Sequence, residues 1–253
     1  MEIAGKKAIV VGGASGMAKA SAELLVEKGA SVAILDRPQS AGAEVASALG
    51  GTFHPCDVTD GDATEAAIDG AVEALGGSLH VSVNTAGGGI ARRTLSKDGP
   101  HPLDEFRGVI ELNLISSFNV ARLAAAHMAR NEPEDEERGV TISTASIAAF
   151  EGQIGQVAYT AAKAGIAGMV LTMARDLGSL GIRALAIAPS LFSTGLTSGI
   201  PDEFADALTK DAAFPKRMGR PEEFGRLVVA IVETPMLNGS YIRLDAGQRF
   251  APK

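Results

Sequence analysis

A tyrosine and a lysine on one helix face are the residues in this sequence best suited to proton chemistry. Tyr159 and Lys163 lie four residues apart in the segment YTAAK, and side chains with that spacing meet on the surface of a helix. A free phenol has a pKa of about 10, which makes it a poor acid–base group at neutral pH. A nearby ammonium favours the phenolate, so we expect Lys163 to lower the pKa of Tyr159.

Ser146 is the third member of this candidate catalytic group. It lies thirteen residues before Tyr159, shortly after the apolar run 140–143. Its hydroxyl can steady a substrate oxygen while Tyr159 takes the proton of an alcohol, and the alcohol carbon then loses a hydride to a nicotinamide. Pairs of Tyr and Lys with this spacing also occur by chance, so the interpretation requires a nucleotide site in the same chain.

A glycine-rich turn near the N-terminus predicts such a site. The apolar run 8–11 leads into GGASGMA (12–18) and then into a helical pattern. Glycines in that position let the backbone approach a pyrophosphate at the N-terminus of a helix. Asp36 ends the next apolar run, twenty residues after Gly16, where a carboxylate hydrogen-bonds the ribose of a dinucleotide.

Asp36 also indicates which dinucleotide binds. A carboxylate at this position repels the 2′-phosphate of NADP, so we expect NAD as the cofactor. Arg37 follows directly and could attract the same phosphate, which keeps NADP as the alternative.

The elements that must position these residues alternate between strands and helices. Apolar runs predict strands at 8–11, 31–35, 52–55, 80–83, 140–143, 184–188 and 240–244. Helical patterns cover 16–28, 39–48, 62–75, 103–130, 157–179, 201–210 and 222–233. This alternation is typical of right-handed βαβ units. We therefore expect an α/β fold, a single Rossmann-like domain over residues 1–253 with a doubly wound parallel sheet of about seven strands and helices on both faces.

The composition narrows the classes of function. The 253 residues have a formal net charge of −7, which argues against nucleic acid and anionic membranes as partners. Cys56 is the one cysteine, and the four histidines lack metal-ligand spacing, so we expect no metal. The sequence shows no signal peptide and no apolar run long enough to span a membrane. We expect a cytoplasmic enzyme.

These residues resemble the short-chain dehydrogenase/reductase family, and the likeness spans essentially the whole chain. It implies a doubly wound sheet, a Ser–Tyr–Lys site, and a fourth catalytic residue, Asn113 in LNLIS, which holds a water in a proton relay to Lys163. Val11, Ala18, Thr85 and Ser190 differ from the residues usual in the family, but none belongs to the catalytic set.

The resemblance also implies a set of cofactor contacts beyond the glycine turn and Asp36. DV (57–58) resembles the pair that contacts adenine, VNTAG (83–87) a segment beside the cofactor, and PSLFST (189–194) the segment at the nicotinamide end. The implied cofactor-binding residues are Gly12, Ser15, Gly16, Met17, Asp36, Asp57, Val58, Asn84, Ala86, Gly87, Tyr159, Lys163, Pro189, Leu191, Phe192 and Thr194.

Longer stretches resemble one branch of the family, whose members oxidise short 3-hydroxyacyl-CoA esters and steroid alcohols with NAD. Among them are TASIAAFEGQIGQVAY (144–159) and LNGSYIRLDAG (237–247). This narrower resemblance implies a small acyl-CoA or steroid-like substrate bound by Ser146, Gln153 and Tyr159, and assembly as a homotetramer.

Two other functions are open on the sequence alone. An NADPH-dependent 3-ketoacyl reductase of fatty-acid synthesis would use the same catalytic residues, but Asp36 argues against it. A nucleotide-binding regulator without catalysis is the second, and the intact set of Ser146, Tyr159, Lys163 and Asn113 argues against that.

Overall fold

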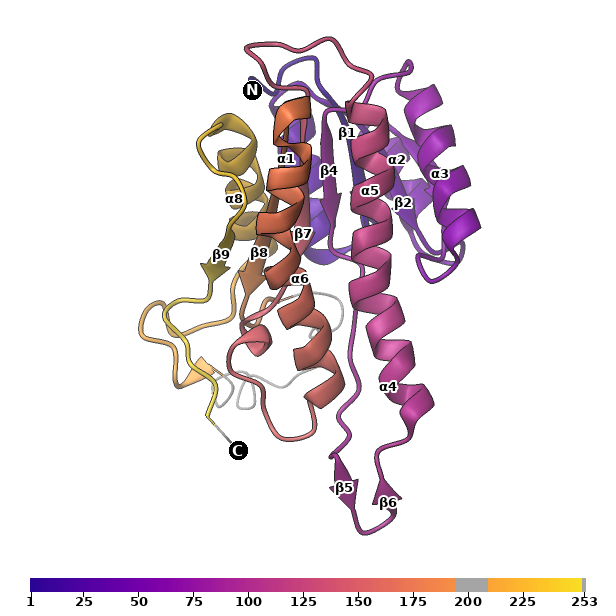
Figure 1. The fold of residues 1–253 in the computed structure, drawn as a ribbon. Coiled ribbons are helices and arrows are strands. Elements are labelled where there is room, and N and C mark those ends of the chain that lie inside the picture. Colours follow the sequence, from indigo (N-terminus) through magenta and orange to yellow (C-terminus); the bar gives the residue numbers. More distant parts are fainter. Residues whose placement is uncertain (194–208, 252–253) are drawn as a thin grey trace.

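A seven-stranded parallel sheet forms the centre of the fold in the computed structural model, which describes residues 1–193 and 209–251 (Figure 1). The strand order is β3-β2-β1-β4-β7-β8-β9. The strands are β1 (Lys7–Val11), β2 (Ser31–Asp36), β3 (Thr52–Pro55), β4 (Val81–Asn84), β7 (Gly139–Thr144), β8 (Ile182–Pro189) and β9 (Tyr241–Leu244). All seven predicted strands are present, and the predicted α/β doubly wound fold is confirmed.

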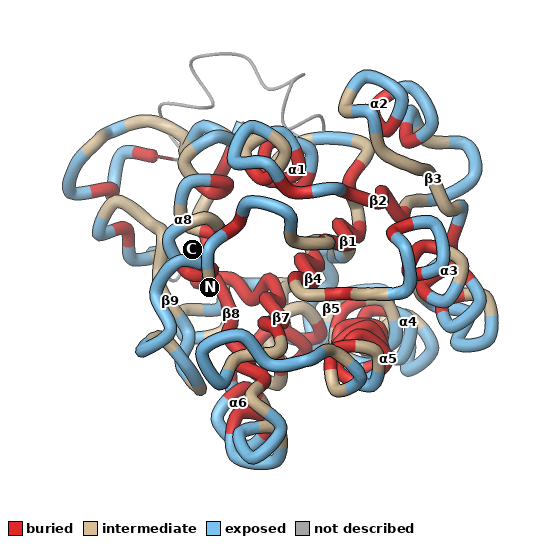
Figure 2. The backbone as a smooth tube through the Cα atoms, turned by 90° about the horizontal axis from the view of Figure 1, so that it is seen from above, coloured by how far each residue is buried: buried red, intermediate tan, exposed pale blue. Residues whose placement is uncertain are grey.

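Helices cover both faces of the sheet (Figure 2). The core on one face includes α1 (Gly16–Glu27), α2 (Gly42–Ala48) and α8 (Pro221–Glu233). The other face is covered by α3 (Gly61–Ala74), α5 (Ser116–Met128) and α6 (Val157–Leu177).

Each central strand supplies side chains to both cores. In β1, Ala8 and Val10 belong to the core under α1 and α8, whereas Ile9 and Val11 belong to the core under α3 and α5. Side chains alternate between the faces of a strand, so a sheet covered on both faces requires nearly continuous apolar strands. That requirement explains why short apolar runs, rather than alternating patterns, mark the strands in this sequence.

The strand order places a crevice beside β1. Strands β2 and β4 flank β1 on its two sides, so the chain reverses its direction of winding there. In open α/β sheets, ligands bind at the carboxyl ends of the strands at this switch point.

Two features of the helical layer and its connections differ from the sequence expectation. The helix predicted over 103–130 contains a π-helical segment, Glu111–Ile115, between α4 (Leu103–Ile110) and α5. Before α4, β5 (Leu95–Ser96) and β6 (Gly99–Pro100) form a short antiparallel hairpin that extends beyond the helices (Figure 1), where no strand was predicted. The predicted helix 201–210 falls mostly outside the described residues.

Two helical stretches, Leu103–Met128 and Val157–Leu180, are long and apolar enough by length and composition to cross a membrane. Their most apolar windows are 56% and 44% buried inside the protein, and α5 and α6 pack on β7 and β8. Both stretches thus fit helices that cover a sheet. In residues 1–193 and 209–251, no group of three His, Cys, Asp or Glu side chains is arranged to hold a metal ion.

Candidate active site

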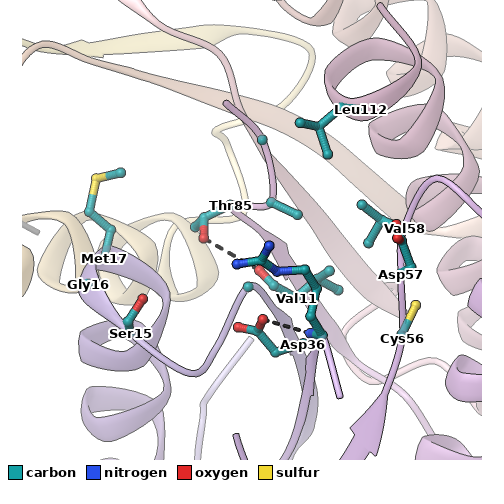
Figure 3. Close-up of a pocket in the computed structure, with 14 residues that line it drawn as sticks. Val11, Ser15, Gly16, Met17, Asp36, Cys56, Asp57, Val58, Thr85 and Leu112 are labelled. Carbon is teal, nitrogen blue, oxygen red and sulfur yellow. Dashed lines mark hydrogen bonds between the residues drawn. The ribbon is translucent and has the colours of Figure 1, made fainter. Parts of the chain in front are cut away.

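A pocket of about 420 Å³ lies at the carboxyl ends of β1 to β4 (Figure 3). Ser15 and Met17 lie on one side and Asp57 and Val58 on the other, with Asp36 between them. Nine predicted cofactor residues line it: Gly12, Ser15, Gly16, Met17, Asp36, Asp57, Val58, Ala86 and Gly87.

Five further residues line the pocket that were not predicted to bind the cofactor: Val11, Arg37, Cys56, Thr85 and Leu112. Three of them, Arg37, Cys56 and Thr85, come directly after a strand, and Val11 ends one. The rule that ligands bind at the carboxyl ends of parallel strands would therefore have identified all four. Leu112 lies in the π-helical segment, which the sequence did not reveal.

The glycine turn is shaped for close approach to a ligand. Gly12 has φ +81°, and a Cβ there would lie 2.9 Å from Thr85 Oγ1 and 3.2 Å from Ala86 N. A side chain would therefore be strained by the backbone and blocked by the loop after β4. This space suits the backbone approach that a pyrophosphate requires.

Asp36 is fixed at the end of β2 by two backbone donors. Its Oδ2 accepts from Ala14 N at 3.0 Å and its Oδ1 from Arg37 N at 2.7 Å. A carboxylate oxygen can accept more than one hydrogen bond, so the group can still accept from the hydroxyls of a ribose. The glycine turn and the carboxylate of Asp36 thus fit a dinucleotide.

Asp57 adds a second negative charge to the pocket. Hydrogen bonds from the backbone and hydroxyl of Thr59, at 3.0 and 2.7 Å, hold the pKa of its carboxyl below the usual value. Arg37 lowers this pKa further by charge attraction.

The candidate catalytic residues come from the carboxyl end of β7 and the first turns of α6. Ser146 begins a 3₁₀ turn, Ile147–Ala149, and its Oγ accepts from Ala148 N at 3.1 Å. Lys163 Nζ lies 5.5 Å from the centre of the Tyr159 ring. The same Nζ donates to the carbonyl oxygen of Thr144, the last residue of β7, at 2.7 Å. The fold thereby brings the serine turn, the phenol and the amine together.

Asn113 connects the π-helical segment to the loop after β4. Its buried Nδ2 donates to Gly88 O at 2.7 Å and to Val109 O at 2.8 Å, while its Oδ1 accepts from Gly88 N at 3.1 Å. Both amide protons are thus used by backbone carbonyls, and Oδ1 has one acceptor position left. Single π turns within α-helices are frequent at functional sites, and here the π turn presents this amide.

A strip of three glycines, 87–89, joins the pocket to the candidate catalytic residues. A Cβ on Gly87, which lines the pocket, would lie 2.5 Å from Asn113 Oδ1 and 3.2 Å from Lys163 Nζ. A Cβ on Gly89 would lie 2.9 Å from Cδ2 of Tyr159. The absence of side chains lets the pocket and the Tyr159 ring share one continuous wall.

The protonation of Tyr159 and Lys163 differs from what the sequence predicts. Burial lowers the pKa of Lys163 to about 7, so the amine is only partly charged at neutral pH. Burial also raises the pKa of Tyr159, and a hydrogen bond with Ser146 opposes that rise. The prediction of a lowered pKa for Tyr159 is wrong for this structure, because desolvation of the phenol outweighs the hydrogen bond with Ser146.

The remaining predicted site residues lie around this centre. Asn84 does not line the pocket; its Oδ1 accepts from Ala86 N at 3.0 Å and so shapes the loop that does. Pro189 ends β8, and Leu191 O accepts from Gly219 N at 2.9 Å. The Phe192 ring is buried and packs edge-on against Phe224.

The predicted substrate residue Gln153 and the predicted cofactor residue Thr194 are not placed in the pocket. Gln153 lies in the loop before α6, where its Oε1 accepts from Gln156 Nε2 at 3.4 Å. Thr194 lies outside the described residues.

Comparison with known proteins defines the class to which this fold and site belong. Residues 12–249 match the family model described as enoyl-(acyl carrier protein) reductase. The chain belongs to the short-chain dehydrogenase/reductase family: it is an oxidoreductase that uses a nicotinamide cofactor.

Its similarity to particular members extends over nearly the full length. The chain is 47% identical over 255 residues to 3-hydroxyacyl-CoA dehydrogenase type-2 of Bos taurus, covering 99% of this chain and 97% of that protein. It is 46% identical to the Drosophila melanogaster protein of the same name, with coverages of 96% and 97%. A crystal structure of 3-hydroxyacyl-CoA dehydrogenase type-2 from Mycobacterium avium matches with a TM-score of 0.94 and 41% identity over 98% of each chain.

Proposed function

We propose that this oxidoreductase is an NAD-dependent 3-hydroxyacyl-CoA dehydrogenase, which interconverts a 3-hydroxyacyl-CoA ester and the 3-ketoacyl-CoA ester. The observation that carries the proposal is the glycine strip 87–89, which joins the dinucleotide-shaped pocket to Tyr159 and Lys163. The full-length similarity to dehydrogenases named for this substrate supports it. Steroid alcohols, the other substrates implied by the sequence resemblance, belong in the same test. By that resemblance we also propose assembly as a homotetramer. The cytoplasmic location stays a prediction from the sequence.

Tyr159 carries the proton that the reaction moves. A nicotinamide cofactor held in the pocket would supply the hydride transfer that accompanies this proton. Because its pKa is raised, the phenol holds its proton at neutral pH and gives it to the ketone oxygen in the reductive direction. Oxidation needs the phenol deprotonated, so higher pH favours it.

The other residues orient the substrate and the proton donor. Ser146 lies within hydrogen-bonding range of Tyr159 and donates from its hydroxyl to the same substrate oxygen. Lys163 is held by Thr144 O, which keeps its amine beside the Tyr159 ring as a member of the proton relay. Asn113 holds the loop at Gly88 and has one free acceptor position for the water of a proton relay.

Asp36 is the residue from which we infer NAD rather than NADP. It would accept from the ribose hydroxyls, and its charge repels a 2′-phosphate. Arg37 stands next to it in the pocket, but Asp57 also acts on that guanidinium, so a phosphate there would meet two carboxylates and one cation.

The test is NADH oxidation with acetoacetyl-CoA, followed by absorbance. Tyr159→Phe is expected to lower kcat by about 10²- to 10⁴-fold, with the Kd for NADH unchanged. Tyr241→Phe, which changes the other tyrosine of the chain on β9, is the matched control and should keep full activity. A Tyr159→Phe enzyme with most of its activity would refute the assigned proton donor.

A substrate panel then tests the class of substrate. The kcat/KM values of 3-ketoacyl-CoA esters and hydroxysteroids, each with NAD(H) and NADP(H), should be highest for the acyl-CoA esters with NAD(H). A higher value for a steroid, or for NADPH, would overturn that part of the proposal.

A further inference from the structure

Four charged side chains form an ionic cluster beside the carboxyl end of β9. Arg243 Nη1 lies 2.9 Å from Glu151 Oε1, and its Nε lies 2.7 Å from Asp245 Oδ2. Arg249 contacts the same two carboxylates, at 3.3 and 3.1 Å. The side chains of Arg243 and Glu151 are 22% and 20% exposed, and that of Asp245 is 9% exposed. The Arg249 side chain is 61% exposed. Because the other three side chains are largely shielded from water and both carboxylates are shared by two cations, this cluster differs from an isolated surface ion pair, which contributes little.

Glu151 connects the cluster to the turn that begins with Ser146. The backbone N of Glu151 donates to Ile147 O at 3.0 Å, and Ala149 N donates to Ser146 O at 3.0 Å. The guanidinium of Arg243 also lies 5.4 Å from the centre of the Phe150 ring. The cluster therefore fixes the end of the same short turn whose first residue presents the Ser146 hydroxyl.

Glu151 also holds the chain that follows β9. Its Oε2 accepts from Phe250 N at 3.2 Å, while Arg243 Nη2 donates to Gln248 O at 3.2 Å. The segment after β9 is thus hydrogen-bonded to both members of the Glu151–Arg243 pair.

Arg243 connects the same cluster to the carboxyl end of β8. In β9, Arg243 is paired with Ala188 and Leu244 with Pro189 of β8, and Ser190 N donates to Leu244 O at 3.1 Å. The chain that leaves β8 here is the segment proposed to lie at the nicotinamide end. One ion pair therefore spans from the serine turn to that segment.

We propose that Glu151 and Arg243 are positioning residues of the active site, whose ion pair holds the Ser146 turn in register with the carboxyl end of β8. This inference rests on the proposed function, since it requires Ser146 to act on the substrate. Neither residue acts as a catalytic group; both act through the backbone of the turn. A displacement of about 1 Å in a reacting group can lower a rate by about 100-fold.

The first test removes the charge of Glu151 without changing its size. Glu151→Gln is expected to lower kcat by roughly 10- to 100-fold, while the Kd for NADH stays within about twofold because the dinucleotide pocket is untouched. Arg243→Lys, which keeps the charge, should retain more activity than Arg243→Met. Glu233→Gln, which removes the ion pair of 3.2 Å between Glu233, the last residue of α8, and Lys28, the residue after α1, is the matched control and should have wild-type kcat.

The second test asks whether Glu151 acts through Ser146. In a Ser146→Ala background, Glu151→Gln should lower kcat no further, because the group that it positions is gone. Equal losses in both backgrounds, or a wild-type kcat for Glu151→Gln, would overturn the positioning role. Circular dichroism shows whether Glu151→Gln folds. If it does not, Arg249→Gln takes its place, because it removes only the more exposed cation of the cluster. This variant should still lower kcat. A folded Arg249→Gln with wild-type kcat would then overturn it.

The same measurements separate the two proposals. A Ser146→Ala enzyme with wild-type kcat would refute the proposed function itself. A Ser146→Ala enzyme without activity, beside a normal Glu151→Gln enzyme, would refute only the positioning role.

Discussion

Lys163 shows how burial sets the chemistry of a single residue in this site. Its amine is enclosed beneath Gly87 and bonded to Thr144 O, and the cost of desolvating a charge lowers its pKa to about 7. An amine that gains or loses its proton near neutral pH can respond to the proton on Tyr159, whereas a fully charged lysine is fixed. The same enclosure predicts a pH dependence of folding stability.

Lys163→Met should remove a stability change that the wild type shows above pH 7. The amine has a pKa of about 7 when folded, against 10.5 for an exposed lysine, so the unfolded chain binds more protons between these values and stability rises with pH. The free energy of unfolding of the wild type should therefore rise, relative to Lys163→Met, by roughly 2 kcal/mol from pH 7 to pH 9. Urea unfolding at both pH values measures this, and a constant difference would contradict it.

Asp36 is the residue that we propose to select NAD over NADP. Asp36→Ala should raise the Kd for NAD by about 10- to 100-fold, the worth of a hydrogen bond to a charged group. The Kd for NADP should fall or stay the same, because the repelling charge is gone. Titration of both nucleotides by fluorescence tests this, with the exposed Asp62 on α3 changed to Ala as the control. Parallel losses for both nucleotides would show that Asp36 does not discriminate.

At the scale of elements, α6 and the π-helical segment must approach closely to bring Lys163 near Asn113. Gly165 makes this contact possible, since a Cβ there would lie 2.8 Å from a methyl carbon of Leu114 in the π segment. Gly168 lies on the same helix with nothing within 4 Å of its Cβ position. Close packing of α6 against the π segment therefore requires a glycine at 165 but not at 168.

Substitution of these two glycines by alanine should have opposite effects on stability. Gly168→Ala is expected to stabilise the protein by about 0.5–1 kcal/mol, since alanine favours the helix. Gly165→Ala should destabilise it by about 1–3 kcal/mol through overpacking against Leu114 and should lower kcat. Denaturant unfolding and activity assays check both, and equal effects of the two variants would contradict the close contact.

At the scale of the whole molecule, the nucleotide pocket is built by four strands of one sheet, so a ligand there ties together segments far apart in the sequence. The lining residues come from the last residues of β1 and β2 and from the segments that follow β1, β2, β3 and β4, with Leu112 from the π segment. A ligand that binds only this folded arrangement must stabilise the whole fold.

NAD should therefore raise the melting temperature. At a concentration 100 times its Kd, the gain is about 2.7 kcal/mol, or about 5–10 °C for a chain of this size. Gly12→Ala should abolish most of the shift, because its Cβ would meet Thr85 and Ala86. Gly61→Ala, with open space at its Cβ position, should keep it. Thermal scans with and without NAD make the measurement, and an unchanged melting temperature for the wild type would exclude this pocket as an NAD site.

Much of this architecture could be predicted because apolar runs and helical patterns are local in the sequence. The strands, the glycine turn and the position of Asp36 all follow from patterns a few residues long. The π turn at Asn113 could not, since it adds one residue to a helix whose apolar pattern continues unbroken. The β5–β6 hairpin likewise lies in a polar segment with no alternating pattern.

The pKa values of Tyr159 and Lys163 could not be predicted from the sequence for a different reason. The spacing of Tyr159 and Lys163 shows that they are neighbours, but their pKa values depend on how deeply other elements bury them. The Glu151–Arg243 pair is also hidden in the sequence, because its members lie 92 residues apart and meet only when β9 joins the sheet.

The strand order has a consequence for how the chain is made on the ribosome. The first four strands of the main sheet to be synthesised, β1 to β4, occupy one half of it, and β7, β8 and β9 then join its free edge in the order in which they emerge. Every strand of the dinucleotide cradle is therefore present before the first residue of α6 has been translated. Each later strand finds a finished neighbour, which shortens the search for its partner during vectorial folding.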